Sequence, residues 1–255
     1  MTASMSSKQI ASRVLVLGAT SAIAMAVEQK LAERGASFFL VARHPERLEA
    51  VRGDLLTRGA TSVAVYALDL DDTASHVKML EVAVEALGAI DLALIAHGVL
   101  GDQAQAEADY AVAEAILRTN FLSAVSLITW LANYFETQKG GTLAAISSVA
   151  GDRGRKSNYV YGASKGALSF FLDGVRNRID RAGVQVLTIR PGFVSSPMTE
   201  HLRQGPLFAS PARVADGILK AIAKRKDVVY VPGFWALIML VIRCIPRSIF
   251  KKMNL

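Results

Sequence analysis

The feature that constrains the fold most is a strand-like run joined to a helix by a glycine-containing turn near the start of the chain. Residues 13–18 read RVLVLG and are rich in β-branched and aliphatic side chains. The following turn, GATSAIA, leads into a pattern in which Ile23, Val27 and Leu31 recur at helical spacing. A buried strand, a tight turn and an amphipathic helix in this order predict the first unit of a parallel α/β sheet.

Apolar strand-like runs and helical patterns alternate along most of the chain. Six further strands are predicted, at residues 38–41, 63–68, 90–96, 143–146, 184–189 and 228–231. Strands that are separated by helices pair in parallel, and the helices then cover both faces of the sheet. The sequence therefore predicts an α/β protein with a doubly wound Rossmann fold and a seven-stranded parallel sheet. We expect a single domain over residues 13–231, after a tail at 1–12 and before an amphipathic extension at 232–255.

Length and composition agree with such a fold. A chain of 255 residues can bury a substantial core without disulfides or metals. Apolar residues make up 52% and aromatic residues 7%, which suits a parallel sheet covered by helices. Cys244 is the single cysteine, which excludes an internal disulfide and a cysteine-based zinc cluster, and the four histidines lack ligand spacing. We expect no structural metal.

The net charge of +7 is concentrated at the C-terminal end. Residues 1–223 carry 22 basic and 21 acidic side chains, whereas residues 224–255 carry seven basic and one acidic. No basic face interleaved with base-reading or stacking residues is found, so we expect no binding of nucleic acid. Residues 1–9 are serine-rich without an apolar core, unlike a secretory signal, and we therefore expect a cytoplasmic protein.

The turn after the first strand is a candidate pyrophosphate site. Thr20 and Ser21 are suited to cap the helix, and the free amides of its first turn, with the helix dipole, attract a phosphate. The turn is similar to the pattern G-x-x-x-G-x-G, with Ala22 and Ala24 in place of the second and third glycines. A plain tight turn is the alternative. The candidate cofactor contacts are Gly18, Thr20, Ser21, Ala22 and Ile23.

Residues after the second and third strands are candidates for binding the adenosine half of a dinucleotide. Arg43 stands where a carboxylate would favour NAD, and a guanidinium there can pair with a 2′-phosphate. We therefore expect NADP(H), with NAD(H) as the second choice, unless Arg43 is only a solvated residue at a helix start. Asp69, followed by Leu70, can accept a hydrogen bond from the adenine amino group or simply cap the next helix.

Two further segments follow predicted strands at the edge where ligands of open α/β sheets bind. Gly98 lets the backbone pass close to a cofactor, and the preceding His97 is interpreted as a loop residue. After the sixth strand, residues 191–196 read PGFVSS. The candidate cofactor contacts in these segments are Ala96, Gly98, Pro191, Gly192, Val194 and Ser196.

A Ser-Ser pair thirteen residues before a Tyr-x-x-x-Lys is the candidate catalytic stretch. Tyr161 and Lys165 are four residues apart and share one face of a helix. A neighbouring ammonium favours the phenolate, so we expect Lys165 to lower the pKa of Tyr161 and make it a general acid. Ser148, at the end of a predicted strand, can hold a substrate carbonyl oxygen. A tyrosine and a lysine four residues apart also occur by chance in helices. The spacing to the Ser-Ser pair is therefore what favours a catalytic role.

Asn120 lies within a long apolar helix predicted over residues 111–135. A buried asparagine in a helix must satisfy its whole amide group. It is therefore either a structural residue that stabilises a kink or part of a proton-relay water site near Lys165.

Together these residues resemble the short-chain dehydrogenase/reductase family in its classical form, over residues 13–231. The resemblance implies a catalytic tetrad of Asn120, Ser148, Tyr161 and Lys165, an NAD(P)-dependent oxidoreductase acting on CH–OH groups, and a homo-oligomer. It also implies that Asp69 contacts adenine and that the PGFVSS segment closes on the nicotinamide, with Tyr161 and Lys165 contacting the cofactor as well. The alanines of the first turn and the sequence Ile-Ala-His-Gly at residues 95–98 depart from the usual family pattern.

A narrower resemblance involves SSVAGDRGRKSNYVYG and the C-terminal RCIPRSIFKKM. Both segments are similar to the keto-reductase subunits of decaprenylphosphoryl-ribose 2′-epimerases. This resemblance implies reduction of a 2-keto sugar carried on a polyprenyl phosphate, with a flavin oxidase as partner. The alternatives are reduction of another hydrophobic ketone, acyl or simple, or a non-catalytic nucleotide-binding module that docks on membranes.

The C-terminal extension has the composition of an interfacial segment. Residues 234–242 are nine consecutive apolar residues, too few to span a bilayer as a helix. Arg243, Arg247 and Lys251 follow at helical spacing, although Pro246 bends any helix there. The segment predicts peripheral contact with the inner face of the cytoplasmic membrane or with a lipid tail, and packing between subunits is the alternative. An apolar lid or simply core is predicted for Phe193, Met198, Leu202, Leu207 and Phe208.

Overall fold

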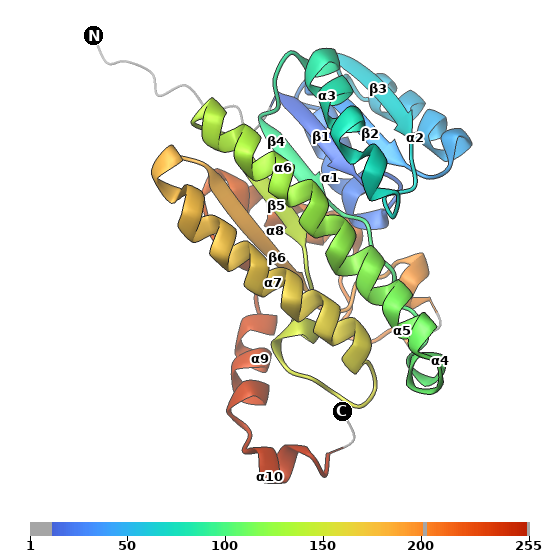
Figure 1. The fold of residues 1–255 in the computed structure, drawn as a ribbon, viewed down its shortest axis with the longest axis vertical. Helices are drawn as coiled ribbons and strands as arrows, with labels where there is room; N and C mark the ends of the chain where they lie inside the picture. The colour runs from blue at the N-terminus through green and yellow to red at the C-terminus, as the bar shows by residue number, and fades with distance from the viewer. Residues whose placement is uncertain (1–11, 201–202, 254–255) are drawn as a thin grey trace.

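The computed structural model describes residues 12–200 and 203–253. Its centre is a single sheet of seven parallel strands in the order β3-β2-β1-β4-β5-β6-β7 (Figure 1). The order turns back at β1, so the first strand lies between β2 and β4 in the middle of the sheet. The predicted doubly wound α/β fold is confirmed. The strands are β1 Arg13–Leu17, β2 Ser37–Ala42, β3 Ser62–Ala67, β4 Leu92–Ile95, β5 Thr142–Ile146, β6 Gln185–Pro191 and β7 Val228–Val231.

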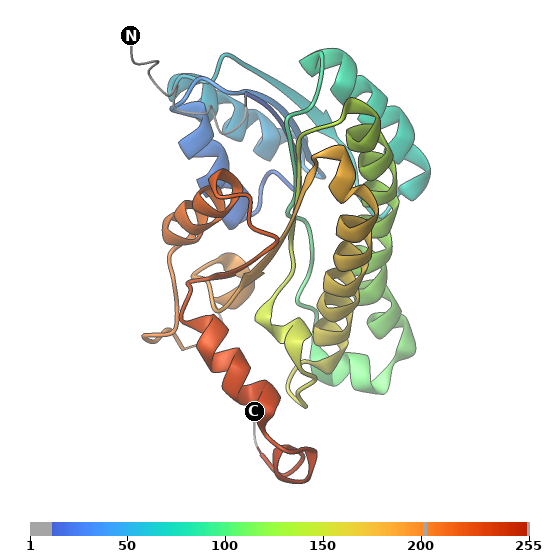
Figure 2. The ribbon, with the colours of Figure 1, turned by 90° about the vertical axis from the view of Figure 1, so that its left-hand side faces the viewer.

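Helices cover both faces of the sheet, which explains why its strands are apolar on both sides (Figure 2). In β1, Val14 and Val16 face the core beneath α1, α2 and α8, and Leu15 and Leu17 face the core beneath α3, α6 and α7. The first layer comprises α1 Ala22–Ala32, α2 Pro45–Thr57 and α8 Pro211–Ala223, and the second comprises α3 His76–Leu87, α6 Ser123–Gln138 and α7 Tyr159–Ile179.

The long helix predicted around Asn120 is longer than expected and irregular. It comprises α5 (Tyr110–Leu117), a π-helical turn (Arg118–Leu122) and α6, after the short α4 (Gln103–Ala108). A π-helical turn inside an α-helix is rare and is frequent at functional sites. By length and composition the stretch could cross a membrane. However, the buried side chains of α6 pack against the sheet in the core.

The C-terminal extension forms two helices that project from the body below the sheet (Figures 1 and 2). These helices are α9 (Trp235–Cys244) and the short α10 (Arg247–Phe250), and Pro246 separates them. Trp235 and Met239 of α9 are buried against Val149, which lies in the short 3-10 helix Val149–Asp152 after β5. The extension is therefore anchored beside the segment that leads from Ser148 to Tyr161.

Candidate active site

The carboxyl ends of the central strands surround a cleft of about 350 Å³. Its volume lies within the usual range for small-molecule sites. Every residue predicted to contact the cofactor lines it, together with Ser148. These residues are Gly18, Thr20, Ser21, Ala22, Ile23, Arg43, Asp69, Leu70, Ala96, Gly98, Tyr161, Lys165, Pro191, Gly192, Val194 and Ser196. Segments far apart in the sequence therefore meet at one edge of the sheet.

Close backbone packing brings α7 against the segment after Ser148. A β-carbon at Gly151 would lie 2.6 Å from the backbone nitrogen of Gly166, so only glycine permits this approach. The hydroxyl of Ser147 also donates to the backbone oxygen of Lys165 over 2.9 Å. These contacts place Tyr161 and Lys165 next to Ser148, whose hydroxyl accepts a hydrogen bond from the backbone of the 3-10 turn.

Burial, and not the neighbouring cation, dominates the proton affinity of the tyrosine. Desolvation raises the pKa of Tyr161, and a hydrogen bond with Ser148 opposes this rise. The ammonium of Lys165 donates to the backbone oxygen of Ile146 over 2.9 Å and lies 6.0 Å from the centre of the Tyr161 ring. The expectation that Lys165 lowers the pKa of the phenol is therefore wrong for this structure. The ammonium is too distant to offset the loss of water around the hydroxyl.

Lys165 is itself strongly affected by burial. Its side chain is almost fully covered, and desolvation lowers the pKa of the ammonium to about 8. A lysine with this pKa is still mostly charged at neutral pH, yet it can lose its proton in mildly alkaline solution.

Asn120 lies behind the cleft and has a fully satisfied amide group. Its oxygen accepts from the backbone nitrogen of Val99 over 2.8 Å, and its nitrogen donates to the backbone oxygen of Val99 over 2.8 Å and to Ser164 over 3.1 Å. A β-carbon at Gly98 would come within 2.8 Å of the Asn120 oxygen and 3.2 Å of the Lys165 ammonium. The side chain of Asn120 thus joins the π-helical turn to the loop after β4.

The nucleotide end of the cleft offers hydrogen-bond donors and positive charge. Ser21 caps α1 by accepting from the backbone nitrogen of Ala24 over 3.2 Å, and Ala22 and Ile23 of the first helical turn line the cleft. Arg43 lines the cleft with Arg47 beside it on α2. Asp69 lines it too, while its carboxylate accepts from the backbone nitrogen of Asp71. This set of groups fits the pyrophosphate and the phosphorylated ribose of a dinucleotide.

The sequence interpretation missed several residues that line the cleft. His97, interpreted from the sequence as a loop residue, is a half-buried part of the wall, bonds to Ser123 over 3.0 Å, and is held neutral because burial and the charge of Lys165 lower its pKa to about 3. Asp71 accepts from Thr119 over 2.6 Å. Asp71 and Arg47 lie two and four residues beyond Asp69 and Arg43. A wider window after each predicted strand would have included them.

The predicted apolar lid is a small aromatic cluster beside the cleft. Phe193 stacks on Phe208 with ring centres 5.2 Å apart and meets Trp235 edge-on at 5.5 Å. Phe193, Met198 and Leu207 are all partly exposed. Leu202 and residues 1–11 of the predicted tail lie outside the described residues.

The family model described as short chain dehydrogenase matches residues 12–207. The chain therefore belongs to the short-chain dehydrogenase/reductase family, and it is an oxidoreductase of a fold that binds a nicotinamide cofactor. An uncharacterized oxidoreductase of Mycobacterium tuberculosis is 39% identical over 95% of this chain and 97% of its own length.

Two solved structures share the fold. Levodione reductase has a TM-score of 0.80, with 21% identity, and covers 88% of this chain and 97% of its own. A variant of actinorhodin polyketide ketoreductase with NADPH has a TM-score of 0.78 with 21% identity, over 87% of this chain and 96% of its own. At this identity the likeness concerns the fold alone.

Proposed function

We propose that this protein uses NADPH to reduce a ketone to a secondary alcohol, and that its substrate is a 2-keto sugar carried on a polyprenyl phosphate. The observation that carries the reaction type is the meeting of Ser148, Tyr161 and Lys165 at the cleft whose other end suits a dinucleotide. Family membership supports the reaction type as well. The C-terminal similarity to keto-reductases of lipid-linked sugars favours the substrate.

The cleft residues divide into a cofactor half and a reaction half. A bound nicotinamide cofactor supplies a hydride to the carbonyl carbon. The amides at the start of α1 hold the pyrophosphate, Arg43 with Arg47 holds the 2′-phosphate, and Asp69 with Leu70 borders the adenine. The segment from Pro191 to Ser196 lines the nicotinamide end.

In the reaction half, Ser148 donates a hydrogen bond to the carbonyl oxygen and fixes its position. Tyr161 donates its phenolic proton to that oxygen as the alkoxide forms. The raised pKa of Tyr161 keeps this proton in place until the oxygen becomes basic. Lys165, charged at neutral pH, is held by the backbone oxygen of Ile146 beside this pair, and Asn120 fixes the wall behind them.

The surroundings of the substrate are proposed from the C-terminal extension. The apolar α9 and the basic residues after it suit a lipid-linked substrate at the inner face of the cytoplasmic membrane, with the body of the protein in the cytoplasm. A flavin oxidase that forms the 2-keto sugar is the proposed partner. We also propose a homo-oligomer.

The decisive experiment follows NADPH oxidation by stopped flow with a panel of ketones. Tyr161→Phe should abolish turnover and leave NADPH affinity within about twofold, because only the proton donor is removed. Tyr159→Phe, an exposed neighbour on the same helix, is the matched control and should retain full activity. Retained turnover in Tyr161→Phe would remove this residue from the reaction.

The ketone panel also separates the proposal from its alternatives. If acyl or simple hydrophobic ketones were reduced as fast as the keto sugar, the proposed substrate would give way to a hydrophobic ketone. NADPH binding without oxidation across the whole panel would identify a non-catalytic nucleotide-binding module.

A further inference from the structure

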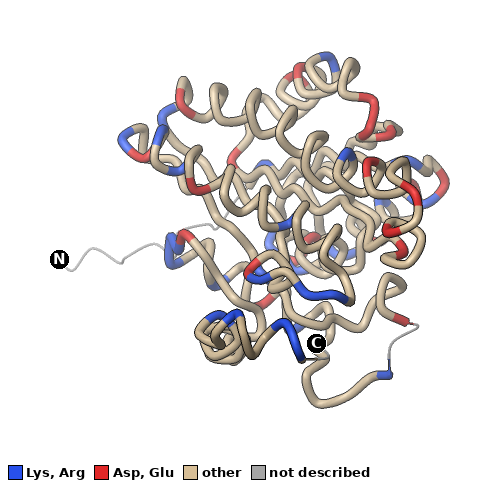
Figure 3. The backbone as a smooth tube through the Cα atoms, turned by 60° about the horizontal axis from the view of Figure 1, so that its bottom comes forward, with Lys and Arg blue, Asp and Glu red and all other residues tan. Residues whose placement is uncertain are grey.

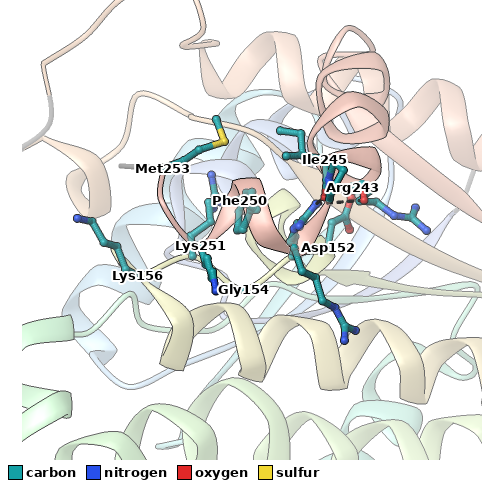
Figure 4. A pocket seen from close by; sticks show the side chains of 12 residues that line it. Asp152, Gly154, Lys156, Arg243, Ile245, Phe250, Lys251 and Met253 are labelled. Atoms are coloured by element: carbon teal, nitrogen blue, oxygen red, sulfur yellow. Dashed lines mark hydrogen bonds between the residues drawn. The ribbon is translucent and has the colours of Figure 1, made fainter.

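A second cavity, of about 830 Å³, opens between the segment at residues 152–156 and the C-terminal helices (Figure 4). Its lining is strongly basic, and the basic segments near the C-terminal end are visible along the backbone in Figure 3. One acidic residue, Asp152, also lines it. The six basic residues of this basic cavity are Arg153, Arg155, Lys156, Arg243, Arg247 and Lys251.

The single carboxylate of the basic cavity is already neutralised from the side of the sheet. Asp152 pairs with Arg190 of β6 over 3.1 Å and accepts from the hydroxyl of Tyr230 of β7 over 2.7 Å. Its side chain is only 3% exposed. Asp152 therefore contributes little negative charge to the cavity space.

Five of the six cations that line the cavity lack such an ion pair among the described residues. Within residues 12–200 and 203–253, no ion pair includes Arg153, Arg155, Arg243, Arg247 or Lys251. Like charges gathered around one space repel each other, and an anion between them removes this cost.

One arginine is held in place by the fold, and a second has a buried nitrogen without a partner among the described residues. Arg153 donates to the backbone oxygens of Ile242, Arg243 (3.1 Å) and Ile245 (2.7 Å) at the end of α9, and its guanidinium lies 3.8 Å above the ring of Phe250. Arg155 is half-buried, and its Nε is buried without a partner among the described residues. Prepositioned guanidinium groups bind the oxygens of a phosphate well, because less side-chain freedom is lost on binding.

An exposed apolar surface leads into the same cavity. Leu237, Leu240 and Val241 of α9 are 67%, 57% and 58% exposed, and Ile249 of α10 is 55% exposed. Arg243, one turn beyond Leu240, belongs to the cavity lining. A basic cavity at the end of an exposed apolar helix face combines the two chemistries of a phosphate-headed lipid.

We propose that the basic cavity binds the phosphate group of a lipid, whose apolar chains contact the exposed face of α9. The site concerns binding only. It does not depend on the reduction of a ketone at Tyr161.

The test is calorimetric titration of the full-length protein with dihexanoylphosphatidylglycerol below its micellar concentration. Saturating NADP⁺ is present throughout, so that the phosphate-binding turn before α1 does not take up the probe. Glycerol phosphate, a phosphate ester without acyl chains, is titrated in parallel. Saturable lipid binding at least tenfold tighter than glycerol phosphate binding is expected. Absent lipid binding would overturn the proposal, and equal affinity for glycerol phosphate would overturn the lipid as its ligand.

Charge variants locate the site. Arg247→Gln/Lys251→Gln removes two exposed cations of the cavity and should weaken lipid binding at least tenfold. Lys224→Gln/Lys226→Gln removes the same charge from the segment before the amino end of β7, whereas the cavity lies beyond its carboxyl end, and should change affinity less than twofold. An equal loss in both variants would indicate non-specific attraction and overturn the site.

A third variant tests the apolar contact. Leu237→Ser/Leu240→Ser should weaken lipid binding at least fivefold and leave glycerol phosphate binding unchanged. Unchanged lipid affinity would remove α9 from the site. Because these side chains are exposed, circular dichroism melts should show that all the variants fold. NADPH affinity and turnover, measured on the same samples, report separately on the proposed reductase.

Discussion

Gly192 and Trp235 occupy adjoining space: a β-carbon at residue 192 would lie 1.9 Å from Nε1 of the indole. Gly192 belongs to the cleft and Trp235 begins α9, so this contact joins the cleft to the C-terminal extension. The indole is 3% exposed and also meets Phe193. A substitution at either residue should therefore affect both the cleft and the C-terminal extension.

Gly192→Ala should displace Trp235 and lower the free energy of unfolding by about 1–3 kcal/mol, as overpacked cores do. Urea unfolding measures the loss, and a red shift of tryptophan fluorescence reports the displaced indole. Gly174→Ala is the matched control. No atom lies within 4 Å of its added β-carbon in α7, so the alanine should stabilise the helix by about 0.5–1 kcal/mol. Equal stability of the two variants would contradict this packing.

Arg43→Ala should weaken NADPH binding by about tenfold or more and change NADH binding less than twofold. The reason is that a guanidinium bonded to a 2′-phosphate forms charge-assisted hydrogen bonds that NADH cannot make. Fluorescence titration with each cofactor provides the measurement. Arg52→Ala, on the helix α2 that follows Arg43 but outside the cleft, should leave both affinities unchanged. If Arg43→Ala weakened NADH and NADPH binding equally, Arg43 would position both cofactors and would not recognise the 2′-phosphate.

Asn120→Ala should lower the free energy of unfolding by about 2–3 kcal/mol, because it leaves both backbone groups of Val99 without their partner. Asn133→Ala removes an exposed asparagine that accepts from Arg178 and should cost less than about 0.5 kcal/mol. Chemical denaturation distinguishes the two. A small effect at residue 120 would contradict the structural role and favour the proton-relay water site.

Lys165 should make stability depend on pH in the alkaline range. Its pKa is about 8 in the folded protein and near 10.5 when unfolded, so the unfolded chain binds more protons between these values. The free energy of unfolding therefore rises with pH in this window, as the penalty for a buried charge disappears. Between pH 7.5 and 9.5 the wild type should gain about 2 kcal/mol relative to Lys165→Met, measured by urea unfolding. A constant difference between the two proteins would show that the lysine is well solvated.

Much of the fold could be predicted from the chain because its signals are local. The run from Arg13 and the helical pattern after Ser21 each lie within one short stretch, and parallel strands put their carboxyl ends at one edge. Residues such as Arg43, Asp69 and Gly98 could be predicted because each lies within three residues of the end of a strand. The π-helical turn at Asn120 was not predicted, since a helical pattern does not show where one extra residue enters a turn.

The amino-acid sequence by itself determined the order of strands and helices and the residues that reach the cleft, because periodicity and spacing are properties of contiguous residues. Only the tertiary structure decided the proton affinities of Tyr161 and Lys165, since burial depends on what distant segments cover them. It also determined which residues line the basic cavity, where Arg153 donates a hydrogen bond to the backbone oxygen of Arg243, 90 residues further along the chain. Such long-range contacts arise only when the whole sheet brings separate segments together.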